Sequence, residues 1–274
     1  LEDGPWGADE VVSTYNNAAL PQTLSVSRVS GSPWSVTFGW DAASRLRTVQ
    51  SPAGVHTYNY FASRGGVTRA ASLVERLDLP NGSQIFKDYD AAGRLTSTEF
   101  RKSGGTVLDG HGYPLLDDAN RRLRQTRTHA GVTTSMDFGY DGLGQLTRAS
   151  GKEPNGTTVR PHEQFWYGYD ANGNLTRRTN DALVVAFEPE ARNRLESATV
   201  SGSLTTEAST VGSATSVTIN EVAATVLADG TFVRANVDLP NGSMNFTAIA
   251  QDSAGRRDTN TVSVTLATAT TFTY

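Results

Sequence analysis

The chain has 274 residues, with 24 basic and 28 acidic side chains and a net charge of −4, which argues against a general polyanion-binding protein. Cysteine is absent, so disulfides and thiolate chemistry are excluded. No apolar run reaches the length of a membrane span, and we expect no membrane insertion. Because the first residue is Leu1 rather than Met, we expect a processed product or a piece of a longer polypeptide.

A short phrase returns along the first two thirds of the chain, and each copy predicts a β-hairpin. In the first copy, Phe38 and Trp40 occupy alternate positions and therefore fall on one face of an extended strand. The next four residues begin with Asp41 and match a type I turn, after which Arg45 and Leu46 start the return strand. The phrase recurs at 87–95, 138–146 and 167–175, in a worn form at 187–195, as a half-repeat at 15–20 and, from Asp118, without its aromatic residues.

The turn residues explain why this phrase forms hairpins. An Asp at the first turn position accepts hydrogen bonds from backbone amides, and a Gly at the fourth position takes a positive φ at no cost. We interpret the repeated aromatic and leucine side chains as sheet packing rather than as ligand contacts. The predicted turn residues are Asp41, Asp90, Gly93, Asp141, Gly144, Asp170 and Gly173.

The pattern aromatic-x-Tyr-Asp-x-x-Gly-Arg-Leu resembles the YD repeat of the Rhs family, found in bacterial Rhs proteins, Tc insecticidal toxin shells and animal teneurins. The resemblance covers about residues 11–198, and the long interval between Asp41 and Asp90 has room for one more decayed copy. It implies an antiparallel hairpin array whose sheet spirals into a hollow shell. It also implies extracellular roles: enclosing a toxic cargo, adhesion or surface scaffolding. The family's self-cleaving motif is missing from this stretch.

Near residue 198 the composition shifts to Thr, Ser, Val and Ala. Alternating strands are predicted at 217–219, 246–250 and 262–266, with turn signals between them, and this segment resembles small bacterial Ig-like sandwiches of surface proteins. The predicted domains are therefore an array at 1–198, a sandwich at 199–267 and the start of a further repeat strand at 268–274. Asp229 and Asp252 could bind calcium, but turn capping is the expected role.

A search for an active site finds no metal-ligand spacing among the four histidines, no phosphate loop and no nucleophile elbow. We therefore expect an all-β protein that is not an enzyme and has no cofactor or metal. Trp6 and Trp34 lie outside the repeat phrase, and they are the residues we would name for a glycan contact.

The function favoured by the sequence is that of a bacterial structural or adhesive repeat protein, extracellular or on the cell surface. We expect it to pair with copies of itself, or with further repeats of the same polypeptide, through the open strand at Phe272 and Tyr274, giving a filament or scaffold. The alternatives are a fragment of an Rhs-type shell that encloses a toxin domain and a carbohydrate-binding surface module. Five or six hairpins are too few to close a shell, so this chain alone would not enclose a cargo. No nucleic-acid partner is expected.

Overall fold

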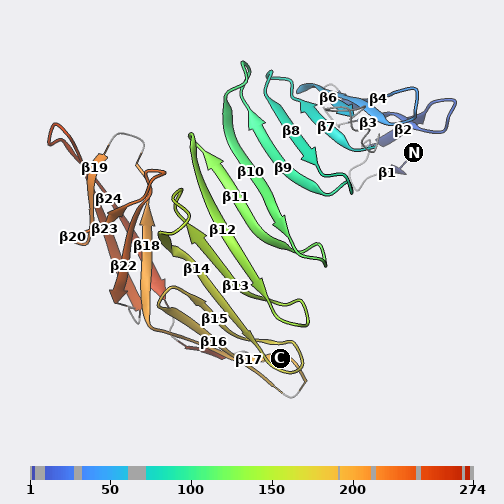
Figure 1. Ribbon diagram of the computed structural model, residues 1–274. Coiled ribbons are helices and arrows are strands. Elements are labelled where there is room, and N and C mark those ends of the chain that lie inside the picture. Colours follow the sequence, from blue (N-terminus) through green and yellow to red (C-terminus); the bar gives the residue numbers. More distant parts are fainter. Residues whose placement is uncertain are drawn as a thin grey trace. The chain divides into compact units, whose positions relative to one another are not determined.

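The computed structural model describes residues 2–3, 10–27, 33–60, 72–190, 192–210, 214–238, 242–266 and 269–271. These residues form strands and no helix, so the predicted all-β fold is confirmed (Figure 1). The chain divides into two compact units, Leu1–Tyr113 and Pro114–Tyr274. The composition change near residue 198 lies inside the second unit, and the predicted domain boundaries stay predictions.

The first unit is an antiparallel meander in which each strand pairs with its neighbours in sequence. Its last strand, β10, extends past Tyr113. The strands are β1 (Glu2–Asp3), β2 (Glu10–Tyr15), β3 (Pro21–Val26), β4 (Trp34–Trp40), β5 (Leu46–Ser51), β6 (Gly54–Tyr60), β7 (Val74–Asp78), β8 (Gln84–Tyr89), β9 (Leu95–Arg101) and β10 (Val107–Leu116).

The second unit begins with a meander of the same kind. Each strand from β11 to β17 pairs antiparallel with the next. After the sandwich the chain returns to this sheet, because Ala269–Thr271 (β25) pairs with β17. The meander strands are β11 (Arg122–His129), β12 (Val132–Tyr140), β13 (Leu146–Lys152), β14 (Val159–Tyr169), β15 (Leu175–Asn180), β16 (Leu183–Pro189) and β17 (Leu195–Ser201).

The repeats whose strand pairing is described share one irregularity. The pairing register shifts just before the residue that precedes the turn, for example between Gly168 and Tyr169. Such a bulge sharpens the local twist of the strand. At the fourth turn position the backbone is left-handed, with φ of 84° at Gly173 and 59° at Ser44, where Gly adopts this conformation more readily than Ser. The repeat is therefore a hairpin with a built-in bend.

Two details of the array correct or extend the sequence interpretation. The prediction that Asp118 opens the weak copy is wrong, because the turn begins at Asp117, whose carbonyl accepts from Asn120 N at 2.9 Å. Two adjacent aspartates made either register possible, and Asn120 settles it by taking the positive φ of 62°. In the long interval, Tyr60 follows a register shift like that of the other repeats, which identifies the strand arm of an additional copy.

The sandwich consists of two small sheets joined by an apolar core. One sheet has the order β18–β22–β21 and the other β20–β19–β23–β24, the order of an Ig-like sandwich without its first strand. Val217 and Ile219 pack against Phe232 from the opposite sheet. Membership of the bacterial Ig-like domains stays a prediction. The strands are β18 (Ser203–Ala208), β19 (Ala214–Ile219), β20 (Val222–Ala223), β21 (Thr225–Val226), β22 (Phe232–Asp238), β23 (Gly242–Asp252) and β24 (Arg257–Leu266).

Candidate functional site

The repeated turn is held by one carboxylate. At Asp90, Oδ1 accepts from the amides of Ala92 and Arg94, both at 2.9 Å, and Oδ2 accepts from Arg94 Nε at 2.6 Å. The backbone hydrogen bond from Arg94 is the main reason why the pKa of Asp90 lies below its usual value. The other predicted turn residues sit in the same geometry: Asp41, Asp141 and Asp170 accept the two amides, and Gly93, Gly144 and Gly173 have positive φ.

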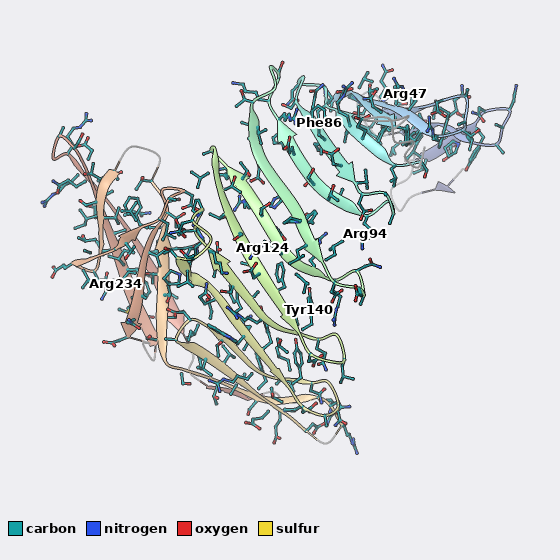
Figure 2. All side chains as sticks on the ribbon, viewed as in Figure 1. Arg47, Phe86, Arg94, Arg124, Tyr140 and Arg234 are labelled. Atoms are coloured by element: carbon teal, nitrogen blue, oxygen red, sulfur yellow. The ribbon has the colours of Figure 1, made fainter. Side chains whose placement is uncertain are left out.

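In four copies of the repeat a tyrosine joins the repeat to the one before it. The hydroxyl of Tyr169 donates to the carbonyl oxygen of Leu146, the first residue of the preceding return strand, at 2.9 Å. Tyr140 makes the same bond to Arg122 O at 2.9 Å (Figure 2). Burial raises the pKa of Tyr169, which keeps the hydroxyl protonated as a donor. Tyr60 and Tyr89 repeat the bond with Leu46 O and Val74 O.

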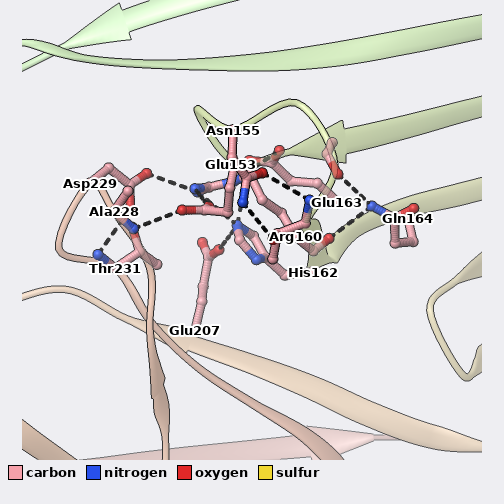
Figure 3. Close-up of polar contacts among 12 residues, drawn as sticks. Glu153, Asn155, Arg160, His162, Glu163, Gln164, Glu207, Ala228, Asp229 and Thr231 are labelled. Carbon is pink, nitrogen blue, oxygen red and sulfur yellow. Dashed lines mark hydrogen bonds and ion pairs between the residues drawn. The ribbon is translucent and has the colours of Figure 1, made fainter.

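The sandwich is fixed to the array by a buried guanidinium. Arg160 lies on β14 and its side chain is 3% exposed. Its Nη1 lies 2.6 Å from Glu153 Oε1 in the array, and its Nη2 lies 2.8 Å from Asp229 Oδ2 in the sandwich (Figure 3). Its Nε lies 3.2 Å from Glu163 Oε2. One cation therefore joins three carboxylates from both parts of the second unit.

Further polar contacts surround this ion pair. Glu153 uses its second oxygen to accept from the amide of Ala228 in the sandwich at 2.8 Å. His162 Nε2 lies 3.3 Å from Glu207 Oε2 on β18 and 3.4 Å from Glu163 Oε1. We call Glu153, Arg160, His162, Glu163, Glu207 and Asp229 the ionic junction.

An irregular stretch of β14 carries three of these groups. The pairing of β14 with β13 shifts register between Gln164, which lies opposite Ser150, and Val159, which lies opposite Lys152, and Arg160, His162 and Glu163 lie within this interval. Gln164 is buried and ties β14 to β13, since it accepts from Ser150 Oγ at 2.6 Å and donates to Gly151 O at 2.8 Å. A side chain at Gly151 would lie 2.1 Å from Glu163 Oε2, which leaves this close approach to Gly alone.

Two carboxylates of the ionic junction, Glu163 and Asp229, are held in their charged form. Burial would raise the pKa of Glu163, but the hydrogen bond from His162 and the charge of Arg160 outweigh it and lower the pKa. Burial likewise opposes ionisation of Asp229, and the amide of Thr231 together with Arg160 lowers its pKa below the usual value. Both carboxylates therefore remain anionic partners of Arg160 at neutral pH.

The charged side chains of the ionic junction pair with one another and hold the sandwich against the array. Among the described residues no three His, Asp or Glu side chains are placed to hold a metal ion. In the same part of the chain no helix has the length and hydrophobicity that a membrane span requires. The sequence interpretation missed the ionic junction; a faint signal was present in the charged residues of a segment, 159–169, that also carries four aromatic residues.

The remaining predicted site residues lie apart from the junction. Trp34 begins β4 opposite Val26 and is 37% exposed. Asp229 caps its own turn by accepting from Thr231 N at 3.0 Å, in addition to its pairing with Arg160. Three of the predicted site residues, Trp6, Phe272 and Tyr274, lie outside the described part of the structure.

Comparisons with known proteins identify the repeat. The family model of the RHS repeat matches residues 140–182, which hold two copies of the hairpin phrase. No curated protein matches the sequence. The fold is similar, at 11% identity and a TM-score of 0.25, to the crystal structure of TcdB2-TccC3-Cdc42, covering 90% of this chain and 17% of that chain.

Two further solved structures are similar at the same low level. The Tc holotoxin pore of Photorhabdus luminescens matches with 10% identity and a TM-score of 0.23, over 87% of this chain and 17% of that one. A porin-like protein from Bacteroides uniformis matches with 12% identity and a TM-score of 0.30, over 89% of this chain and 96% of that one. The chain thus spans 17% of the length of each matched Tc chain.

Proposed function

Because this chain belongs to the Rhs-repeat (YD-repeat) family, we propose that it is a structural segment of an Rhs-type β-shell wall that acts outside the cell. The single observation that carries this proposal is the tyrosine bond that four copies of the repeat make to the preceding return strand, as from Tyr169 to Leu146 O. Together with the strand pairing it joins neighbouring repeats within each unit into a sheet. Neighbouring repeats stabilise one another in such arrays, as a wall requires.

The ionic junction adds a second structural task. A single residue, Gly202, links the end of β17 to β18, the first strand of the sandwich. After the sandwich the chain returns to the array at β25. We propose that the sandwich is an Ig-like insertion, which Arg160 holds against the wall instead of leaving it on a flexible tether. A cation buried among three carboxylates is costly to break, because removing it leaves the carboxylates unpaired.

Electron microscopy of the secreted full-length polypeptide tests the wall. The expected image is a closed hollow body in which residues 2–271 form part of the wall and the sandwich occupies one fixed position on it. An extended arm with no enclosing sheet would contradict the shell. Sequencing the parent gene supplies the independent arm of the test, since a shell that encloses a toxin requires a further domain.

Self-assembly through strand pairing is the second structural candidate. It is favoured by β25, which adds to β17 at the end of the meander and so leaves a sheet edge there. Deletion of residues 268–274 is expected to leave the sandwich folded and to abolish filaments seen by microscopy. Filaments of the truncated chain, or an intact chain that stays monomeric at high concentration, would rule out this route of assembly.

A carbohydrate-binding role has one observation in its favour. Trp166 is 43% exposed and, with Arg177, Thr179 and Asp181, lines a cavity of about 550 Å³. The Thr179 hydroxyl is buried without a hydrogen-bond partner. An aromatic face beside polar groups suits a sugar ring. On a glycan array, binding lost in Trp166→Ala and kept in Trp34→Ala would support this role; binding kept in both would exclude the cavity.

A further inference from the structure

The wider sheet of the sandwich keeps part of its inner face uncovered. The sheet that contains β18 has three strands, whereas the sheet that contains β24 has four. Val262 on β24 lies opposite Phe246, and Phe246 packs against the core of the sandwich. Val262 therefore points inward, because residues directly opposite each other share one face of a sheet. It is nevertheless 54% exposed.

A cavity of about 670 Å³ lies beside this uncovered strip. Its apolar wall includes Val217, Ala248 and Ala250, which belong to the core or pack against it. The other walls come from Ala208 at the end of β18 and from residues 256–260 at the start of β24. The space therefore adjoins the end of β18 and the inner face of β24.

In the part of the chain that the structure describes, the segments that flank the sandwich leave no strand to fill this space. Compared with the order of an Ig-like sandwich, the vacant position belongs to the strand that precedes β18. The residues before β18 are already used, since β17 ends at Ser201 and pairs within the array. On the other side, β24 ends at Leu266 and β25 joins the array from Ala269. A strand in this position must come from elsewhere.

The strands that border the vacancy carry few of the usual protections against pairing. Proteins blunt open edges with lysine, proline or bulges. Neither 203–208 nor 257–266 contains lysine or proline. The pairing of β24 with β23 runs from Arg257 to Leu266 without a register shift. The pairing of β18 with β22 shifts once, between Leu204 and Thr206, and is regular from Thr206 to Ala208 at the end that borders the cavity. Among the described strands, β18 pairs with β22 alone.

We propose that this vacancy is an acceptor groove for an extended strand supplied by another polypeptide. The incoming strand pairs with the free edge of β18 and lays alternate apolar side chains onto Val262 and Ala248. Asp258 lies on the same inner face, opposite Ala250, and selects a basic residue at one end of the strand. In this mode of recognition the main chain supplies affinity and the alternating side chains supply specificity.

A defined peptide tests the groove. The probe is a fluorescent peptide of sequence Lys-Thr-Val-Thr-Val-Thr-Val-Thr, titrated with the complete chain and followed by anisotropy. Val262→Glu is expected to weaken binding by roughly tenfold or more, because the carboxylate would be buried against apolar side chains. Thr261→Glu is the matched control; it adds the same charge to the opposite face of β24 and is expected to leave binding unchanged.

Three results would overturn the proposal. One is the absence of saturable peptide binding by the unchanged chain. Another is an equal loss of binding in Val262→Glu and Thr261→Glu, or equal binding of a peptide whose valines are adjacent. The third is a dimer of the chain that Val262→Glu dissociates and that binds no peptide, since the groove would then be occupied by a second copy. The outcome of this test does not depend on the proposed role of the array as a shell wall, because peptide binding reports only on the groove in the sandwich.

Discussion

The turns of the array and the ionic junction both pair carboxylates with arginine, but they do so at different depths and distances. In a turn, Asp90 binds Arg94 four residues away, near the surface, and the arrangement recurs along the chain. In the junction, Arg160 binds Asp229, which lies 69 residues away in the sequence. The side chain of Arg160 is 3% exposed, and this arrangement is not repeated along the chain in the way the turns are. An exposed pair is screened by water, whereas a buried one cannot lose a partner without leaving a charge unpaired. Stability should therefore depend little on any one turn and strongly on the junction.

Replacing Arg160 should have the largest effect. Arg160→Ala leaves the buried Glu153 and the half-buried Glu163 and Asp229 without their cation, and we expect a loss of about 3–5 kcal/mol in the free energy of unfolding of the second unit. Arg178→Ala is the matched control, because Arg178 is exposed on neighbouring β15. Denaturant unfolding followed by tryptophan fluorescence measures both. Equal and small losses would mean that the junction is dispensable.

The second largest loss of stability is expected at the connection between the array and the sandwich. Gly202 has a φ of 89°, and a side chain there would lie 2.0 Å from the carbonyl oxygen of Ala182. Gly202→Ala should therefore destabilise the second unit by about 1–3 kcal/mol. Gly131→Ala serves as control, since Gly131 has a φ of 81° and open space around it. Similar losses at both sites would show that φ, and not the contact with the array, sets the cost.

The sequence was sufficient to predict the hairpin turns of the array, because each turn is formed by residues that are close in the sequence. A turn is specified by residues four apart, so the repetition of Asp, Gly and Arg revealed the hairpins. The register was wrong at the weak copy, where the turn begins at Asp117 instead of Asp118. The junction depends on which strands the fold brings together. Arg160 and Asp229 become neighbours because β18 and β22 lie on the array, and no spacing in the sequence encodes that contact. The exposed Trp166 was missed for the same reason.

Lowering the pH tests an ion pair that is less buried than the junction, the pair of Asp137 with Arg124. Arg124 donates two hydrogen bonds to Asp137, and with Lys152 it lowers the pKa of Asp137 to about 2. Because the folded pKa lies below its ordinary value, the contribution of Asp137 is full above about pH 4 and is lost as the pH falls through about 2. The stability difference between the unchanged chain and Asp137→Asn should shrink over that range. A difference that stays constant would contradict the ion pair.

The smallest effect is expected at a single turn. Asp90→Ala removes both amide bonds and the contact with Arg94, whereas Asp90→Asn keeps an oxygen for the amides, as Asn16 does in its own turn. Thermal unfolding should rank Asp90→Asn closer to the unchanged chain than Asp90→Ala, and both closer than Gly202→Ala. If Asn is as harmful as Ala, the arginine contact matters more than the amides.

The claim that array and sandwich form one structural unit is tested most directly by a double-mutant cycle across the junction. Arg160→Met and Asp229→Asn are measured singly and together by denaturant unfolding. Since the two side chains lie 2.8 Å apart in different modules, we predict a coupling free energy of about 1.5 kcal/mol or more. Additivity within about 0.5 kcal/mol would show that the sandwich is not held by this pair and would contradict the account.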